Sequence, residues 1–162
     1  MGELVEVVER DGTVVRVVER AVMRAERLRH RAVFIAVLDH EGRLLVHRRS
    51  EEKDVWPGRW DLAAGGVVGV GEPWDEAARR ELAEELGLTD PVELVGDGCF
   101  EDEDVALVGR VYRCRSDGPV TFADGEVVEA RWVTPEELAA LRAEVAFVPD
   151  SVALVLPLLD LG

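Results

Sequence analysis

Residues 66–88 read GVVGVGEPWDEAARRELAEELGL, and this stretch decides how the rest of the chain is interpreted. Its glycine-rich first third is typical of a loop, and the remainder predicts a helix from Pro73 to Leu86. Pro73 suits a first helical turn, where a missing N–H costs nothing, and Gly87 suits the left-handed residue that ends a helix. An apolar stripe should dock this helix on a sheet. The stripe consists of Ala78, Leu82 and Leu86.

Three carboxylates share one face of this predicted helix. Glu81, Glu84 and Glu85 stand at positions i, i+3 and i+4, so their side chains are neighbours. Like charges this close repel one another and raise at least one pKa unless a cation separates them. Carboxylate oxygens are the ligands that Mg²⁺ and Mn²⁺ prefer. The spacing therefore indicates a divalent-metal site, although an isolated ExxEE pattern is more often a solvated helix face.

The same stretch matches a known family pattern at every fixed position. The pattern is the Nudix box, G-x5-E-x7-R-E-U-x-E-E-x-G-U, in which U is a bulky apolar residue, and the chain therefore resembles the Nudix hydrolases. The fixed positions are Gly66, Glu72, Arg80, Glu81, Leu82, Glu84, Glu85, Gly87 and Leu88. The resemblance implies an α/β fold in which a mixed β-sheet lies between helices, as an α/β/α sandwich. It also implies a hydrolase that cleaves a diphosphate bond with a metal-activated water.

The resemblance further implies roles for individual residues. Arg80 would fix a glutamate of the box through a bidentate ion pair. A glutamate near the last strand completes the metal site or acts as general base in several members, and Glu126 takes this role here, with Glu129 as the competitor. The general base is then Glu81 or Glu126, and the sequence does not decide between them. The groups expected to hold Mg²⁺ or Mn²⁺ are the carbonyl of Gly65 and the carboxylates of Glu81, Glu84, Glu85 and Glu126.

Substrate contacts are expected upstream of the box. Arg48, Arg49 and Lys53 precede the Trp56-Pro57-Gly58 loop, and arginine binds phosphate bidentately, although a charged strand end is the alternative interpretation. The box fits nucleoside triphosphates, nucleotide sugars, dinucleotides and non-nucleotide diphosphates alike. Specificity should therefore depend on three loops, at residues 53–60, 99–104 and 147–151. Three aromatic residues could stack a base but are more often packing residues: Trp56, Trp74 and Phe100.

The flanks of the box point to one branch of the family and to an alternative activity. Residues 28–72 read LRHRAVFIAVLDHEGRLLVHRRSEEKDVWPGRWDLAAGGVVGVGE and resemble the branch related to isopentenyl-diphosphate isomerase. The isomerase pattern has a catalytic Cys and a metal-binding His shortly after the equivalent of Trp60. Gly65 and Val67 stand at those two positions here. The absence of a protonating thiol speaks against isomerase activity. An isomerase-like enzyme is nevertheless one alternative to a hydrolase, and a catalytically silent Nudix domain that binds a nucleotide or a partner is another.

The remaining pattern predicts strands around the box. Residues 3–18 predict a β-hairpin with a type I′ turn at Asp11-Gly12, and residues 19–30 a short helix or a connection. Thr134, Pro135 and Glu137 predict the capped start of a helix. Further strands are expected within residues 31–39, 44–48, 61–70, 92–116 (two strands) and 127–133, and an apolar helix over 151–161.

Length and composition limit the function classes. With 162 residues, of which 48% are hydrophobic, we expect one domain: residues 1–30 form the hairpin and connection, and residues 31–162 the Nudix core. The net charge of −15 argues against binding nucleic-acid polymers, which requires a basic surface.

Neither a membrane helix nor a signal peptide is apparent, so a cytoplasmic protein is expected. The apolar N-terminal hairpin offers an edge for a homodimer. Cys99 and Cys114 are expected to be reduced packing residues.

Overall fold

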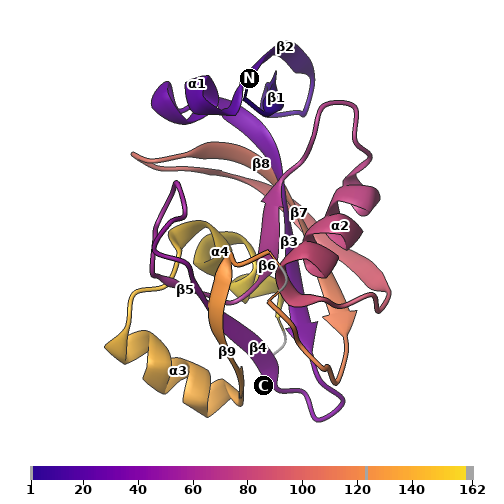
Figure 1. The fold of residues 1–162 in the computed structure, drawn as a ribbon, viewed down its shortest axis with the longest axis vertical. Coiled ribbons are helices and arrows are strands. Elements are labelled where there is room, and N and C mark those ends of the chain that lie inside the picture. The colour runs from indigo at the N-terminus through magenta and orange to yellow at the C-terminus, as the bar shows by residue number, and fades with distance from the viewer. Residues whose placement is uncertain (1, 123, 160–162) are drawn as a thin grey trace.

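The computed structural model describes residues 2–122 and 124–159, and its centre is the long strand β3, Arg29–Leu38 (Figure 1). Strand β6 (Ala64–Val67) pairs antiparallel with β3, and β8 (Ala106–Arg115) pairs parallel with it. Strand β7 (Val92–Glu101) extends the sheet beyond β8. Parallel and antiparallel neighbours of one strand make the sheet mixed, as the sequence predicted.

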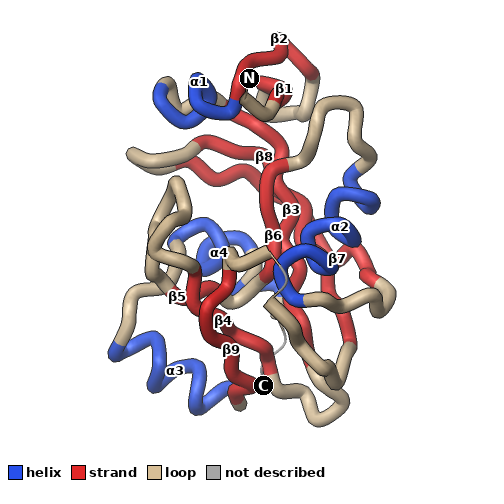
Figure 2. The backbone as a smooth tube through the Cα atoms, viewed as in Figure 1, coloured by secondary structure: helices blue, strands red, loops and turns tan. Residues whose placement is uncertain are grey.

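A second group of strands bends away from this sheet. Strand β4 (Leu44–Arg49) pairs with β5 (Trp60–Asp61) and with β9 (Val127–Val133). The pair Leu38–Leu44 is the point at which β3 and β4 meet. The two groups of strands therefore open from a shared corner (Figure 2).

Helices cover both faces of β3. Val33 and Ile35 pack against helix α2 (Trp74–Leu86). Their neighbours on the other face, such as Phe34, pack in the core with the C-terminal helices. Those helices are α3 (Pro135–Glu144), α4 (Pro149–Leu154) and the short 3-10 helix η1 (Leu156–Leu158). The predicted sandwich of helices around a mixed sheet is confirmed.

Helix α2 follows the sequence prediction closely. Its three-residue apolar stripe is buried, and Pro73 lies immediately before the helix rather than in it. Gly87 ends the helix at φ +67°, and its N–H donates to the Ala83 carbonyl at 2.9 Å. The capping box of α3 is also confirmed, because Thr134 and Glu137 exchange hydrogen bonds of 3.2 and 3.0 Å.

The N-terminal hairpin is present, but its predicted type I′ turn is wrong. Strands β1 (Leu4–Val8) and β2 (Val14–Glu19) pair, and helix α1 (Arg20–Ala25) follows. A type I′ turn needs positive φ at both central residues, whereas Gly12 has positive φ and Asp11 does not. The Gly12 N–H donates instead to the Glu9 carbonyl at 2.9 Å, which makes a three-residue connection.

The C-terminal prediction was partly wrong. The helix expected over residues 151–161 begins at Pro149 and ends at Leu154, and η1 follows it. Pro157 lies in η1 and has no N–H with which to continue an α-helix. Residues 160 and 161 of that expectation lie outside the described residues.

Two smaller expectations also changed. The strand expected over residues 61–70 is split into β5 and β6, and Cys99 is exposed, whereas Cys114 is buried as expected. Within the described part of the chain, no helix is long and apolar enough to cross a membrane.

The end of α2 makes a testable contribution to stability. An alanine at residue 87 would have to adopt φ +67°, and its Cβ would overlap the Thr121 side chain. An alanine at residue 42 would have to adopt φ +82°, but its Cβ would have open space around it. Gly42→Ala should cost about 1–2 kcal/mol, the penalty of the left-handed conformation alone. Gly87→Ala should cost about 1 kcal/mol more, because Thr121 must also move. Urea unfolding monitored by circular dichroism tests this, and equal losses would contradict the steric contribution.

Candidate functional site

Arg80 ties the acidic residues of the box together. Its Nε and Nη2 donate to the two carboxylate oxygens of Glu72, at 2.8 and 2.9 Å. Its Nη1 donates to Glu81 at 2.7 Å and to Glu84 at 3.2 Å. The Arg80 hydrogen bonds hold the pKa of Glu72 below its usual value. The geometry thus contains the expected bidentate pair, and Glu72 is the glutamate that it fixes.

Glu81 lies against the glycine-rich loop. It is buried, and a Cβ at residue 66 would displace its carboxylate, so glycine is needed there for the two to pack. Burial raises the pKa of Glu81 to about 7, although the Arg80 guanidinium opposes this shift.

Glu85 is more deeply buried, with 2% of its surface exposed. Its Oε1 accepts a hydrogen bond of 2.9 Å from the Gly65 N–H. Burial raises the pKa of Glu85 to about 8. Gly65 lies so close to β3 that a Cβ would overlap the Val33 carbonyl oxygen. The backbone therefore passes tightly between β3 and the carboxylate.

The box glutamates do not form a closed cage of ligands. Within residues 2–122 and 124–159, no three acidic, His or Cys side chains converge closely enough to hold a metal ion. Glu84 is about half exposed, and it shares Arg80 Nη1 with the buried Glu81. The available donors are nevertheless carboxylate oxygens, and buried carboxylates with raised pKa values gain most from a cation. This donor set fits Mg²⁺ or Mn²⁺.

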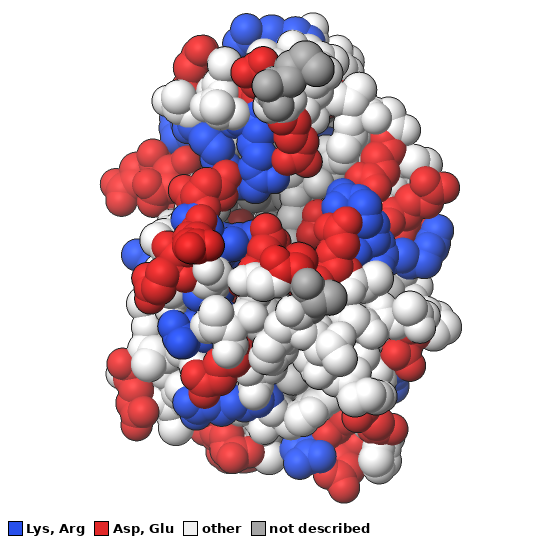
Figure 3. Space-filling model, viewed as in Figure 1, with Lys and Arg blue, Asp and Glu red and all other residues white. Residues whose placement is uncertain are grey.

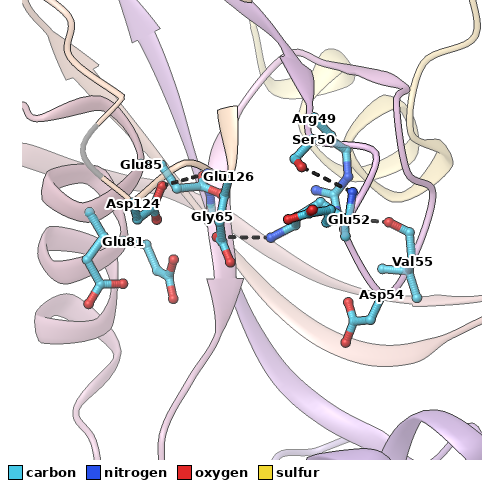
Figure 4. A network of polar contacts seen from close by, with 12 residues as sticks. Arg49, Ser50, Glu52, Asp54, Val55, Gly65, Glu81, Glu85, Asp124 and Glu126 are labelled. Atoms are coloured by element: carbon cyan, nitrogen blue, oxygen red, sulfur yellow. Dashed lines mark hydrogen bonds and ion pairs between the residues drawn. The ribbon is translucent and has the colours of Figure 1, made fainter. Parts of the chain in front are cut away.

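Glu126 lies beside the buried glutamates of the box, whereas Glu129 does not. Figure 4 shows Glu126, Glu81 and Glu85 near one another, between α2 and the segment before β9. Glu126 accepts a hydrogen bond of 3.0 Å from Lys53 Nζ, and its charge contributes to the raised pKa of Glu81. Glu129 pairs instead with Arg48 and Arg131, at 3.7 and 3.5 Å.

The three expected phosphate-binding residues are separated by the structure. Arg49 and Lys53 line a cavity together with Gly65 and Gly66. Arg48 is absent from the cavity lining and pairs with Glu51 and Glu129 on the surface. A register shift between Arg48 and Arg49, together with strand alternation, accounts for the difference. The prediction for Arg48 is therefore not supported.

The cavity is lined by both apolar and charged side chains. Four basic and two acidic side chains line it, so positive charge dominates locally in a protein of net charge −15. Basic and acidic side chains face each other across a hollow on this surface (Figure 3). The charged lining residues are Arg20, Arg24, Arg49, Lys53, Asp61 and Asp150, and the apolar ones include Phe34, Val55, Trp56 and Leu107.

Four of these charged residues escaped the sequence analysis. Arg20 and Arg24 come from α1, and both donate through Nε to Asp54 Oδ2 at 3.1 Å. Asp61 left a visible signal, since it is a carboxylate inside an otherwise apolar stretch. Asp150 falls within the loop over residues 147–151 that was expected to affect specificity, but nothing singled it out, because its position depends on a contact with β5, far away in sequence.

Comparison with known proteins agrees with the fold and the box. A family model described as NUDIX domain matches residues 28–153. The uncharacterized Nudix hydrolase YfcD of Salmonella typhi is 45% identical over 150 residues, which cover 92% of this chain and 80% of that protein. The uncharacterized Nudix hydrolase PA4841 of Pseudomonas aeruginosa is 40% identical over 133 residues, covering 82% of this chain and 79% of that protein.

Solved structures give the same result. The crystal structure of DR0079 from Deinococcus radiodurans superposes with a TM-score of 0.79 at 29% identity, covering 93% of this chain and 96% of that one. The NUDIX domain of Shewanella oneidensis NrtR, complexed with ADP ribose, has a TM-score of 0.63 at 17% identity, covers 84% and 94% of the two chains, and shares the fold alone. With the complete box and the family match over residues 28–153, the chain belongs to the Nudix hydrolase family.

Proposed function

We propose that the protein is a cytoplasmic, Mg²⁺- or Mn²⁺-dependent hydrolase that cleaves the diphosphate bond of a nucleoside diphosphate linked to another group, or of a related organic diphosphate. The observation that carries this proposal is one cavity in which the box loop, Gly65-Gly66, meets Arg49 and Lys53. Glu85 hydrogen-bonds this loop, and Glu126 hydrogen-bonds Lys53. The groups that we expect to bind a cation and those that we expect to bind phosphate are thus linked by direct hydrogen bonds at this cavity, which supports the proposal.

Each residue then has a separate task. The carbonyl of Gly65 and the carboxylates of Glu81, Glu84, Glu85 and Glu126 would hold the metal. When bound, the metal neutralises charge on the diphosphate and lowers the pKa of a water. Arg80 positions Glu81 and Glu84 while it is itself fixed by Glu72.

Arg49 and Lys53 would contact phosphate oxygens. Glu81 or Glu126, whose carboxylates belong to the same cluster of charges, would accept the proton of the attacking water.

The structure also bears on the isomerase alternative. Its catalytic Cys would have to stand at residue 65, where any Cβ overlaps the Val33 carbonyl oxygen. Val67 replaces the metal-binding His, and it is buried and apolar. The silent binding module is opposed by the intact box and by the buried, raised-pKa pair Glu81 and Glu85. Hydrolysis therefore has the stronger support.

Hydrolysis should depend on the buried glutamates of the box and not on exposed acidic residues of α2 that lie outside the box pattern. Glu81→Gln and Glu85→Gln should each lower kcat by on the order of 100-fold or more. Glu76→Gln, at an exposed position of the same helix, is the matched control and should stay within about twofold of wild type. The measurement is product mass and phosphate release from a panel of nucleoside and organic diphosphates with Mg²⁺ or Mn²⁺. Double-bond migration in isopentenyl diphosphate without phosphate release would instead establish the isomerase alternative.

Stability should depend on pH in the absence of metal. The pKa of Glu85 is raised from 4.5 to about 8, so the folded protein holds a proton that the unfolded chain loses in this interval. The free energy of unfolding should therefore decrease as pH rises from about 5 to about 8.5 in EDTA. Glu85→Gln should reduce this decrease, and Mg²⁺ should reduce it in wild type, because the cation replaces the proton. Urea titrations at several pH values measure the slope, and a slope that Mg²⁺ leaves unchanged would count against metal binding.

We also propose a homodimer through the N-terminal hairpin. Among the described strands, none pairs with the outer edge of β2, and Val14, Val15 and Val17 are exposed there. Apolar strand edges of this kind pair readily with another copy. Val15→Lys should convert a dimer into a monomer in light scattering, whereas Val70→Lys, at an equally exposed loop position, should not. A monomeric wild type at high concentration would remove this proposal.

A further inference from the structure

The loop over residues 50–59 holds an aromatic side chain in the cavity wall at a conformational cost. Trp56 has φ +46°, a left-handed conformation that bulky residues rarely adopt. Its indole Nε1 donates to Asp104 at 3.3 Å, and the ring is 8% exposed. The ring lines the same cavity as Phe34. Strained residues that their surroundings hold in place are typical of ligand-binding sites.

A long-range contact brings a carboxyl group to this cavity. The Trp60 N–H donates to the Ala146 carbonyl at 3.1 Å, and the Val148 N–H donates to the Trp60 carbonyl at 2.9 Å. The segment over residues 146–148 therefore runs beside β5 and carries Asp150 to the cavity lining. Asp150 Oδ1 accepts the Ser151 N–H at 2.7 Å, and its Oδ2 has no hydrogen-bond partner among the residues described.

Asp150, Asp61, Trp56 and the box loop Gly65-Gly66 all line one cavity. The negative charge of Asp61 adds to the raised pKa of both Glu85 and Asp150, which burial causes in the first place. A substrate whose diphosphate is bound near Gly65 and Gly66 can thus place its organic part against Trp56 and Asp150 in the same cavity.

We infer that this part of the cavity binds a nucleobase that carries an exocyclic amino group, with Trp56 against the ring and Asp150 at the amino edge. The inference rests on the proposed function, because it identifies the organic part of the same diphosphate substrate. An ionised carboxylate only accepts hydrogen bonds, so it suits the amino groups of cytosine, adenine and guanine. Uracil lacks an amino group and presents a carbonyl oxygen in its place, which a carboxylate repels. Hypoxanthine likewise lacks the amino groups of adenine and guanine.

Matched nucleotide pairs test this inference without metal or catalysis. Binding of CMP against UMP, and of GMP against IMP, is measured by calorimetry in EDTA at about pH 8.5. Burial raises the pKa of Asp150 to about 7, so this carboxyl group is ionised under those conditions. In wild type, the amino-bearing member of at least one pair should bind at least about tenfold more tightly. Equal affinities within both pairs, or no binding of any of the four nucleotides, would overturn the inference.

Two substitutions of Asp150 and one control substitution separate the loss of base recognition from a general loss of structure. Asp150→Leu should bring the members of each pair within about twofold of each other, and Asp97→Leu, at an exposed carboxylate outside this cavity, should leave the preference unchanged. Asp150→Asn keeps the size of the side chain and gains an N–H that can donate to the uracil carbonyl oxygen, so it should bind UMP more tightly than wild type does. A preference that survives both Asp150 substitutions would overturn the inference.

Failure of base recognition can be distinguished from failure of the proposed hydrolase activity. If Mg²⁺-dependent hydrolysis proceeds but the paired nucleotides bind equally, base recognition alone is wrong. If the base preference is present but no diphosphate is hydrolysed, the proposed hydrolase activity alone is wrong.

Discussion

The close approach of Gly65 to β3 is the constraint on which the site depends. Strand β6 pairs antiparallel with β3 through Phe34 and Gly65, and the residue-65 backbone leaves no room for a side chain against the Val33 carbonyl. From this position the Gly65 N–H reaches Glu85 on α2. One short strand thus fixes the distance between the central sheet and the acidic helix. Any widening at this point would separate the box loop from its glutamates.

The charges of the site resolve an apparent conflict between protein and substrate. A chain with a net charge of −15 should repel an anionic diphosphate, yet the cavity wall collects more basic than acidic side chains. Arg20 and Arg24 share the single carboxylate of Asp54, and Lys53 pairs with Glu126. These ion pairs hold the basic side chains in place when no ligand is bound. A phosphate group or a metal ion can then exchange with an existing partner instead of ordering a disordered side chain.

Local periodicity explains which features the sequence could predict. The helix over residues 74–86, its buried stripe and the Thr134 cap depend on residues within a few positions of one another, and all were found. The Asp11-Gly12 turn failed because the same dipeptide also fits a three-residue connection, in which Gly12 alone has positive φ. Arg48 and Arg49 are neighbours on β4, and strand alternation alone could not say which of the two faces the cavity. The sequence named the loop over residues 147–151 but could not single out Asp150, because hydrogen bonds between residues 146–148 and Trp60 determine its place.

The residues of the box and the other residues of the cavity come from different parts of the sequence. The chemistry of the diphosphate is specified by residues 66–88, which form one continuous stretch with a recognisable pattern. Elsewhere the cavity is lined by residues of α1, β3, β4, the loop over residues 50–59, β5, β8 and α4. Helix α1 even precedes residues 28–153, where the family match lies. A pattern confined to the box therefore identifies the family and its diphosphate chemistry, whereas the other side chains of the cavity come together only in the three-dimensional fold.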